Sequence, residues 1–280
     1  MKACPLLFTS PLGMYEWWHH PRKELLDCQR ENNRETGDDQ MVEPKFCQAL
    51  IIGVAHLDPQ GESRLLRAFR QWKPDLITLE VSEYAIAFRR DNGERLRQKL
   101  LALTEPIHDA HGQIAALFAK LQIPFEVTAA DAYCRECGGW FHCLDDSDLS
   151  RQYLNEFAFE AISADNVAHL LTMENLPLAR QVERVYRRVR RLLADEPVIP
   201  ALLGNDRRLA MMQRRDELMQ KRVEMMLRER RPRRWIHVGG AEHLLRIKGY
   251  RLFYERFADR EMHRRLLDND ENEFPTEEVP

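Results

Sequence analysis

Short apolar runs alternate with longer amphipathic stretches along most of this chain. The apolar runs have the length of β-strands, and Gly, Pro or charged residues bound each of them. Their residue types and boundaries predict a strand at each run, whereas none of them is long enough for a helix of ordinary length. The predicted strands occupy residues 46–52, 76–79, 125–128 and 235–238.

The stretches between these runs show helical periodicity. After the first run, Leu65, Phe69 and Trp72 recur at the spacing of three and four residues that defines one face of a helix. Strands that alternate with such helices are typical of βαβ units. We therefore predict an α/β fold with a mainly parallel central sheet flanked by helices, and with a helical insertion before the last strand. The other predicted helices occupy residues 109–121, 150–170, 174–193 and 206–229.

The two ends of the chain depart from this pattern. Residues 1–45 read as an N-terminal extension that is partly irregular, because 29–44 is polar and has no sustained period. The acidic segment 265–280 carries two prolines and is typical of a flexible tail. The interpretation is one α/β domain over residues 46–264 between these two segments.

Composition narrows the class of protein. The chain has 280 residues, of which 44% are hydrophobic, and this is enough for a sizeable core. No segment approaches the run of about 18 apolar residues that a membrane-spanning helix needs, and residues 1–21 lack the apolar region of a signal peptide. We expect a soluble, cytoplasmic protein without a membrane partner. Basic residues dominate 171–234, but no groove-reading motif accompanies them, so nucleic acid is not favoured as a partner.

The cysteines leave a zinc site open without favouring it. Cys134 and Cys137 have the Cys-x-x-Cys spacing of structural zinc sites, and His142 and Cys143 follow closely. Such sites normally need a second, well-separated pair of ligands, which this segment does not offer. Unlinked cysteine thiols in a loop are therefore the favoured interpretation, with no metal bound.

Chemically selective side chains follow each predicted strand. His56, Glu80, Asp131 and His243 stand after the first, second, third and last of them. In an open parallel sheet, ligands bind beyond the carboxyl ends of the strands, where these residues would meet. The two histidines arrive through the same Gly-x-x-His turn, in which glycine permits a close approach of the backbone. Taken singly, each residue has a simpler explanation, and both carboxylates could cap the following helices.

Two imidazoles and a carboxylate suit two related chemistries. They are the ligands that a catalytic divalent metal uses when one position stays open for water, and Mn, Co or Zn fits this set. A metal-free variant would use one histidine as the general base, with Glu80 orienting it. Both chemistries end in hydrolysis.

The ordered set of motifs resembles the TraB/PrgY/Tiki superfamily, which includes GumN-like proteins. The shared features are a strand ending in Gly-x-x-His, a Lys-Pro-Asp step, a strand ending in Glu, an Arg-x-x-x-Met helix and a second Gly-x-x-His, and the resemblance spans about residues 46–255. Here these features are Gly53 to His56, Lys73 to Asp75, Glu80, Arg215 to Met219, and Gly240 to His243.

The resemblance implies a parallel α/β core and, for the Tiki-like branch, metal-dependent hydrolysis of peptide bonds. It marks His56 and His243 as metal ligands, Glu80 as a ligand or general base, and Arg215 as a partner for a carboxylate or oxyanion. The chain departs from the pattern after Glu80, where Val81 replaces the usual Asp. Arg89 is then the best candidate for the substrate-orienting arginine that the family carries nearby, and Glu242, just before His243, is a further candidate acid.

These observations predict a metal-dependent hydrolase that acts on a peptide or other amide or ester bond, with activated water as the nucleophile. Its partner would be a peptide or a small-molecule substrate. The alternative is a non-catalytic regulatory protein on the same scaffold that binds a ligand, haem or a metal.

Overall fold

The computed structural model describes residues 48–105, 111–193, 197–203, 206–257 and 262–269. Its centre is a five-stranded sheet in which every neighbouring pair is parallel, with the strand order β3-β2-β4-β1-β5. The prediction of a parallel α/β fold is therefore confirmed. The strands are β1 (Gln48–Val54), β2 (Leu76–Leu79), β3 (Trp140–Cys143), β4 (Arg234–Gly240) and β5 (Met262–Leu266).

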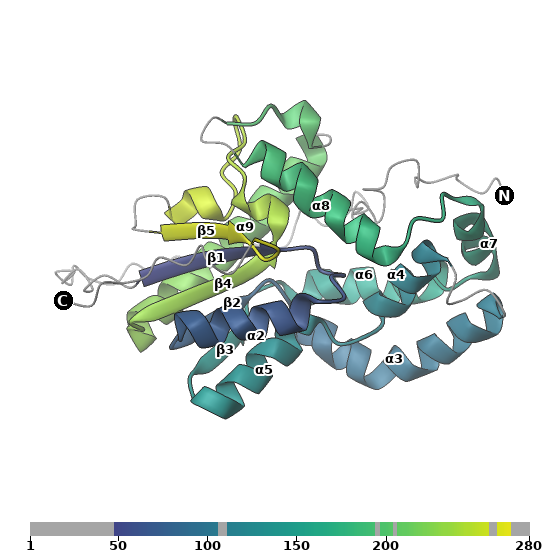
Figure 1. Ribbon diagram of the computed structural model, residues 1–280, viewed down its shortest axis with the longest axis horizontal. Helices are drawn as coiled ribbons and strands as arrows, with labels where there is room; N and C mark the ends of the chain where they lie inside the picture. Colours follow the sequence, from purple (N-terminus) through teal and green to yellow (C-terminus); the bar gives the residue numbers. More distant parts are fainter. Residues whose placement is uncertain (1–47, 106–110, 194–196, 204–205, 258–261, 270–280) are drawn as a thin grey trace, which may run out of the picture. The chain divides into compact units, whose positions relative to one another are not determined.

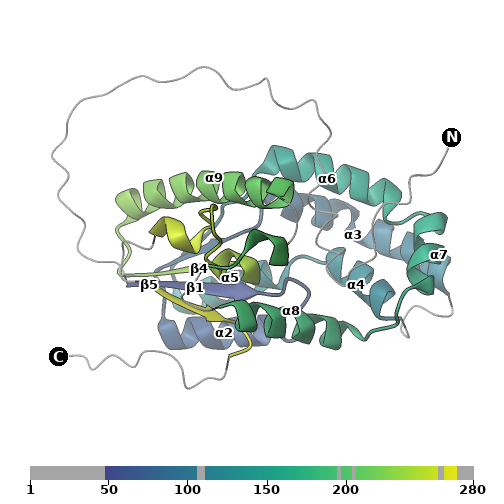
Figure 2. The ribbon, with the colours of Figure 1, turned by 90° about the horizontal axis from the view of Figure 1, so that it is seen from above.

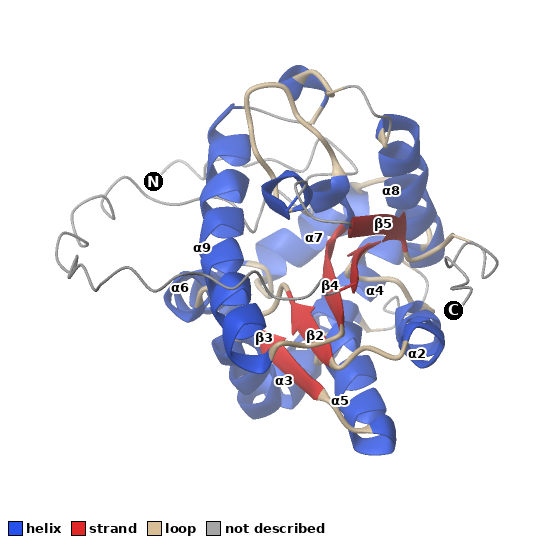
Figure 3. Cartoon of the chain, turned by 90° about the vertical axis from the view of Figure 1, so that its left-hand side faces the viewer, coloured by secondary structure: helices blue, strands red, loops and turns tan. Residues whose placement is uncertain are grey.

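The inner strands are buried on both faces. Helix α9 (Asp206–Arg230) covers one face of the sheet and α2 (Gly61–Trp72) the other, as Figures 2 and 3 show. All of β2 and all but the first residue of β1 are buried, which explains why these strands read as continuous apolar runs rather than as alternating ones.

Other helices lie beyond the carboxyl ends of the strands, where Figure 1 shows α3, α4, α6 and α7. Several of these helices begin directly after a residue whose side chain accepts a hydrogen bond from the first turn. Ser82 accepts a hydrogen bond from Ala85 N at the start of α3, and Asp146 accepts bonds from Asp148 N and Leu149 N at the start of α6. The helices are α3 (Glu83–Thr104), α4 (Gly112–Lys120), α6 (Ser147–Glu160), α7 (Ala164–Thr172) and α8 (Leu178–Leu192).

The predicted strand at 125–128 is wrong, because these residues begin helix α5 (Phe125–Cys137). A run of four residues cannot distinguish a strand from a helix by its period, and here the burial of the whole segment decides. Its buried positions recur at helical spacing and pack α5 against α2. The third strand of the sheet is β3, which lies further along the chain. The buried residues of α5 are Glu126, Val127, Ala129, Ala130 and Tyr133.

Two further boundaries differ from the prediction. The helix predicted over 150–170 is divided into α6 and α7, and the side chain of Ser163 caps the second of them. Strand β5 was not predicted, and it continues past residue 264, where we expected the domain to end. Leu267 N then donates a hydrogen bond to Gly53 O. Residues 1–47 and 270–280, which hold the predicted extension and most of the predicted tail, lie outside the described residues.

Short 3₁₀ helices complete the architecture: η3 (Pro200–Leu202), η4 (Ala241–Leu244) and η5 (Tyr254–Phe257). Helix η4 directly follows β4 and contacts β1, so it covers the carboxyl end of the central strands. Within the described ranges, no helix combines the length and the apolar character that crossing a membrane requires.

The register brings the ends of the three inner strands level. Gly53 of β1 pairs with Gly239 of β4, and Leu79 of β2 pairs with Val238 of the same strand. The loops that follow β2, β4 and β1 therefore leave the sheet side by side, and the residues just after these strands can meet.

Candidate functional site

The three residues predicted to form the core of the site converge beside Gly240. A Cβ atom placed on this glycine would lie 3.1 Å from His56 Nε2. The same point is 3.5 Å from His243 Cδ2 and 3.6 Å from Glu80 Oε2. Residues distant in sequence thus share one spot at the carboxyl end of the sheet, as expected for a ligand site in an open parallel sheet.

The first glycine of each Gly-x-x-His turn makes room for the other turn. A Cβ atom on Gly53 would approach Leu244 Cδ1 to 2.6 Å and Ala241 Cα to 2.9 Å, both in η4, which contains the second turn's histidine. A Cβ atom on Gly240 would press on His56 of the first turn. The packing of the two loops therefore leaves no room for a side chain at Gly53 and only a tight fit for one at Gly240.

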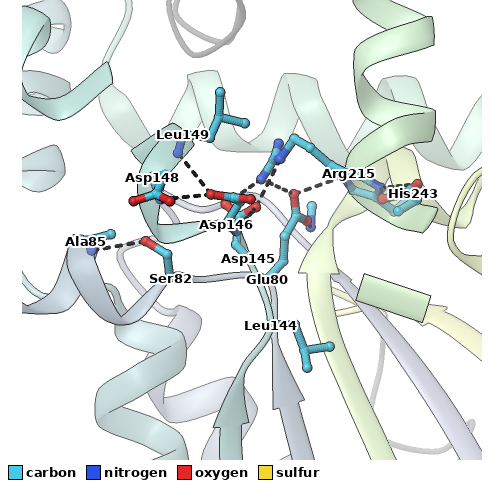
Figure 4. Close-up of polar contacts among 12 residues, drawn as sticks. Glu80, Ser82, Ala85, Leu144, Asp145, Asp146, Asp148, Leu149, Arg215 and His243 are labelled. Atoms are coloured by element: carbon cyan, nitrogen blue, oxygen red, sulfur yellow. Dashed lines mark hydrogen bonds and ion pairs between the residues drawn. The ribbon is translucent and has the colours of Figure 1, made fainter. Parts of the chain in front are cut away.

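Glu80 lies at the centre of the cluster and is almost fully bonded (Figure 4). Its Oε1 lies 3.0 Å from His243 Nε2 and 3.0 Å from Arg215 Nη2, and its Oε2 accepts a 2.7 Å hydrogen bond from Gly240 N. Burial favours the neutral acid, but the charges of His243 and Arg215 outweigh it and hold the pKa of Glu80 well below its ordinary value. Glu80 is therefore ionised at neutral pH.

His243 is held between two carboxylates. Its Nδ1 lies 2.8 Å from the carboxylate of Asp216 on α9, while its Nε2 faces Glu80. Burial disfavours the imidazolium, but both carboxylates outweigh this effect and raise the pKa of His243 well above its ordinary value. Asp216 is completely buried and also accepts a 2.7 Å hydrogen bond from Phe253 N, which fixes its position.

Arg215 reaches the cluster from α9 and is itself anchored. Its Nε and Nη2 donate to the two carboxylate oxygens of Asp145 at 3.1 and 2.7 Å, in the paired geometry that an arginine fork favours (Figure 4). Asp145 follows β3 directly after Leu144, and Arg222 donates to the main-chain carbonyls of both residues. Arg215 thus links the ends of β2 and β3 to α9.

His56 stands on the solvent side of the cluster. About a third of its side chain is exposed, and its Nδ1 lies 2.7 Å from the buried carboxylate of Glu126. Burial lowers the pKa of His56, but the hydrogen bond and charge of Glu126 outweigh this effect, so the net shift is upward. Tyr186 fixes the loop, because its hydroxyl accepts from Ala55 N and donates to Asp58. His56 also lines a cavity of about 840 Å³.

A third imidazole, that of His237 in β4, lies close to Glu80. It stacks on Phe253 with ring centroids 3.8 Å apart, and its Nδ1 lies 3.1 Å from Thr78 Oγ1. Its Nε2 has no hydrogen-bond partner among the described residues. A Cβ atom on Gly239 would lie 2.9 Å from this nitrogen and 3.0 Å from Glu80 Oε2, so both atoms face the same space. Burial lowers the pKa of His237 to about 3, which keeps it neutral.

Two hydrogen bonds to main-chain carbonyls hold the side chain of Arg89, and neither of them involves Glu80. Arg89 is buried in α3, where it donates to Ala85 O at 2.9 Å and to Lys120 O at 3.0 Å. These bonds hold the end of α4 against α3. These bonds give Arg89 a structural role. Burial lowers the pKa of Arg89 to about 10, and the charge of Glu126, the partner of His56, acts against this shift.

Asp131 and Glu242 also lie apart from the cluster. Asp131 belongs to α5 rather than to the end of a strand, and it pairs with Arg135 on the helix surface. Glu242 lies in η4 and pairs with Arg208 at 2.6 Å. Asp145 occupies the end of the true third strand, which is the place that the sequence analysis assigned to Asp131.

The arrangement offers metal ligands of the right kind, although they are paired with one another. His56 and His243 each direct Nδ1 at a carboxylate, which is how metal-binding histidines are commonly oriented, and Glu80 lies near both. In the described part of the chain, no group of three or more His, Cys, Asp or Glu side chains is spaced to hold a metal ion. Cys134, Cys137 and Cys143 are free thiols there, but they lie in α5 and β3 and not in the predicted loop.

The residues that orient the cluster were missed by the sequence analysis. Asp216 had a local signal, since it directly follows the predicted Arg215. Glu126 had none, because its segment was interpreted as a strand, and His237 read as an interior strand residue. Asp145 follows an apolar strand, but its strand was not recognised.

Comparison of the chain with protein-family models, with curated proteins and with solved structures gave no match.

Proposed function

We propose that this chain is a hydrolase of TraB/Tiki type that cleaves an amide or ester bond, with His56, Glu80 and His243 as its reactive centre. One observation carries the proposal: the three side chains, predicted from separate motifs, gather around Gly240 at the carboxyl end of the sheet. A solvent-facing imidazole backed by a buried carboxylate is a standard arrangement for proton transfer.

His56 is the best candidate for the group that exchanges a proton with water or substrate. It is the only member of this trio that lines the cavity, and Glu126 fixes which of its ring nitrogens faces the cluster. Glu80 is a weak base because its pKa is depressed. Its negative charge therefore pairs with His243 and Arg215, or would bind a cation. Arg215 is placed to stabilise negative charge that develops near Glu80.

The proposal includes a divalent cation held by His56, Glu80 and His243. Such an ion would supply Lewis-acid activation of water near neutral pH. Four carboxylates surround the three ligands, those of Glu80, Asp216, Glu126 and Asp145, and Arg215 and a protonated His243 offset part of their charge. Loss of the His243 proton would leave a surplus of negative charge that a cation could balance. Its binding requires His243 to release the proton that it shares with Glu80, so affinity for the ion would fall as the pH is lowered.

A metal-exchange experiment tests the proposal. The full chain is stripped with a chelator, assayed against a panel of fluorogenic peptides and aryl esters, and reassayed with Mn²⁺, Co²⁺ or Zn²⁺. We expect turnover with at least one of these ions, and a loss of roughly 100-fold or more in both His56→Ala and His243→Ala. His169→Ala, on the exposed surface of α7, is the matched control. Retention of metal by both variants would contradict the metal site, and full activity in both would contradict the reactive centre.

One observation favours a second function. The hydrogen-bonding capacity of Glu80 is filled by the chain itself, and the cavity beside His56 has the size of a ligand site. A non-catalytic binding protein would use the cavity and keep the charged cluster as a rigid support. Saturable binding without product, over the same panel and with the metals supplied, would favour this alternative.

A further inference from the structure

The cavity next to His56 is built from surfaces far apart in the sequence. One face of α3 contributes Arg97 and Leu101, which lie four residues apart, and one face of α4 contributes Phe118 and Ala119. The loop that carries His56 and the start of α5 close the remaining sides. At about 840 Å³ the cavity lies within the range of pockets that bind small organic molecules, roughly 300–1,000 Å³.

The wall of the cavity is mainly apolar. Phe118, Ile123 and Phe125 line it and stay partly exposed, because they face the open space rather than the core. Phe125 is held in place by α2, where a Cβ atom on Gly61 would overlap its ring at 2.4 Å. This wall is therefore fixed by the packing of α2 against α5, and it suits an apolar ligand.

Arg97 is the one arginine or lysine among the described residues that line this cavity. It makes no ion pair or hydrogen bond with another described residue, and its side chain is only partly exposed. The acidic lining residues do not neutralise it: Asp58 is bonded to Arg64 and Tyr186, and Glu62 lies exposed in the first turn of α2, where solvent screens its charge. An unpaired guanidinium beside apolar walls favours an anionic group on the ligand, and a carboxylate matches its fork.

We infer that the cavity binds an apolar molecule with a free carboxylate, such as a peptide with an apolar C-terminus. Its apolar groups pack against Phe118 and Phe125, and its carboxylate pairs with Arg97. His56 lines the same cavity, so a bond within the ligand lies beside the reactive centre. The assignment of this ligand as a substrate rests on the proposed hydrolase function, whereas its binding does not.

A pair of matched probes tests this inference. N-acetyl-Leu-Phe with a free carboxylate and the corresponding C-terminal amide are titrated calorimetrically into the full chain in the presence of a chelator. We expect the carboxylate to bind about tenfold or more tightly than the amide, because the charge-assisted pair with Arg97 forms only with the acid. Equal affinities, or no binding of either probe up to millimolar concentration, would overturn the inference.

Substitutions on α3 and α4 test which side chains produce the preference for the carboxylate probe. Arg97→Gln should abolish the preference for the carboxylate, whereas Arg97→Lys should retain part of it. Arg95→Gln is the matched control, since Arg95 is exposed on the same helix and bonds only to Asn92 in the described contacts. Ala119→Trp should weaken both probes by filling the cavity. A preference that persists in Arg97→Gln, or unchanged binding in Ala119→Trp, would contradict the assignment.

The same titrations separate this inference from the proposed function. Tight binding of the carboxylate with no product after metal is added would leave the cavity assignment intact and count against the hydrolase. Turnover of the peptides without any preference for the carboxylate would support the hydrolase and overturn the cavity assignment.

Discussion

The two Gly-x-x-His turns share a sequence pattern but place their histidines in different surroundings. His243 is buried, lies between Glu80 and Asp216, and has both ring nitrogens occupied. His56 is partly exposed, is paired through one nitrogen with Glu126, and faces a cavity. Both turns follow neighbouring parallel strands, so the difference arises from the helices that pack over each turn.

The comparison indicates a division of labour. A buried imidazole between two carboxylates holds its proton and its position, and so stabilises the charged cluster. An imidazole that opens to a cavity can exchange protons with whatever occupies it. One turn therefore supports the site while the other meets the ligand, and the variants below test this separation.

The largest expected effect comes from removing the shared centre. Glu80→Ala leaves the buried charges of Arg215 and His243 without their partner, which should lower the free energy of unfolding by about 3–5 kcal/mol. His56→Ala should cost only about 1–2 kcal/mol, because water in the cavity can replace its bond to Glu126. Urea denaturation of both variants measures the difference. Equal losses would mean that His56 supports the fold as much as the buried centre does.

The two motif glycines offer a smaller contrast. Gly53→Ala places a methyl group 2.9 Å from the backbone of Ala241, which cannot move freely, so about 1–3 kcal/mol should be lost. Gly240→Ala presses on the imidazole of His56, which can turn aside, and should cost less than about 1 kcal/mol. Gly240→Ala should nevertheless shift the His56 resonances. Thermal unfolding and nuclear magnetic resonance spectra of both variants check this, and the reverse order of stabilities would contradict it.

The smallest expected effect is a dependence of stability on pH. The pKa of His243 is higher in the folded chain than its ordinary value of 6.5, so its ion pairs contribute fully below pH 6.5. That contribution should be lost as the pH rises through the folded-state pKa. Glu80 has the opposite sign: its depressed pKa stabilises the fold above its ordinary value of 4.5, and this is lost as the pH falls through the folded-state value.

Titration of the two imidazoles by nuclear magnetic resonance measures these shifts. We expect His243 to titrate at higher pH than His56, because two carboxylates flank it instead of one. Asp216→Asn should lower the pKa of His243 and leave that of His56 nearly unchanged. A lower pKa for His243 than for His56 in the unaltered chain would contradict the assigned ion pairs.

Local sequence patterns predicted most of the fold. The apolar runs of β1, β2 and β4 are continuous because helices cover both faces of the sheet, and the amphipathic stretches became α4, α8 and α9. The pattern failed at α5, where a run of four residues has no decisive period, and it missed the strands β3 and β5. The edge strand β5 carries Arg264 and Arg265, so it lacks the apolar run by which the inner strands were recognised.

The candidate site divides in the same way. His56, Glu80 and His243 could be predicted because parallel strands deliver the residues after them to one edge, and Arg215 lies where its motif suggested. Glu126, Asp145, Asp216 and His237 could not be predicted as their partners, because each comes from an element whose position depends on packing. Arg89 and Glu242 satisfied the sequence criteria, but in the structure they bond to other parts of the chain.

The sequence by itself determined the class of fold and the identity of the three convergent side chains, since alternating apolar runs and glycine turns are local properties. Only the tertiary structure decided which imidazole is buried and which one opens to the cavity. That outcome depends on how α9 covers the second turn and on how α4 and α5 leave space beside the first. Burial and neighbouring charge, which set the protonation of each imidazole, are properties of the packed chain and not of the motif.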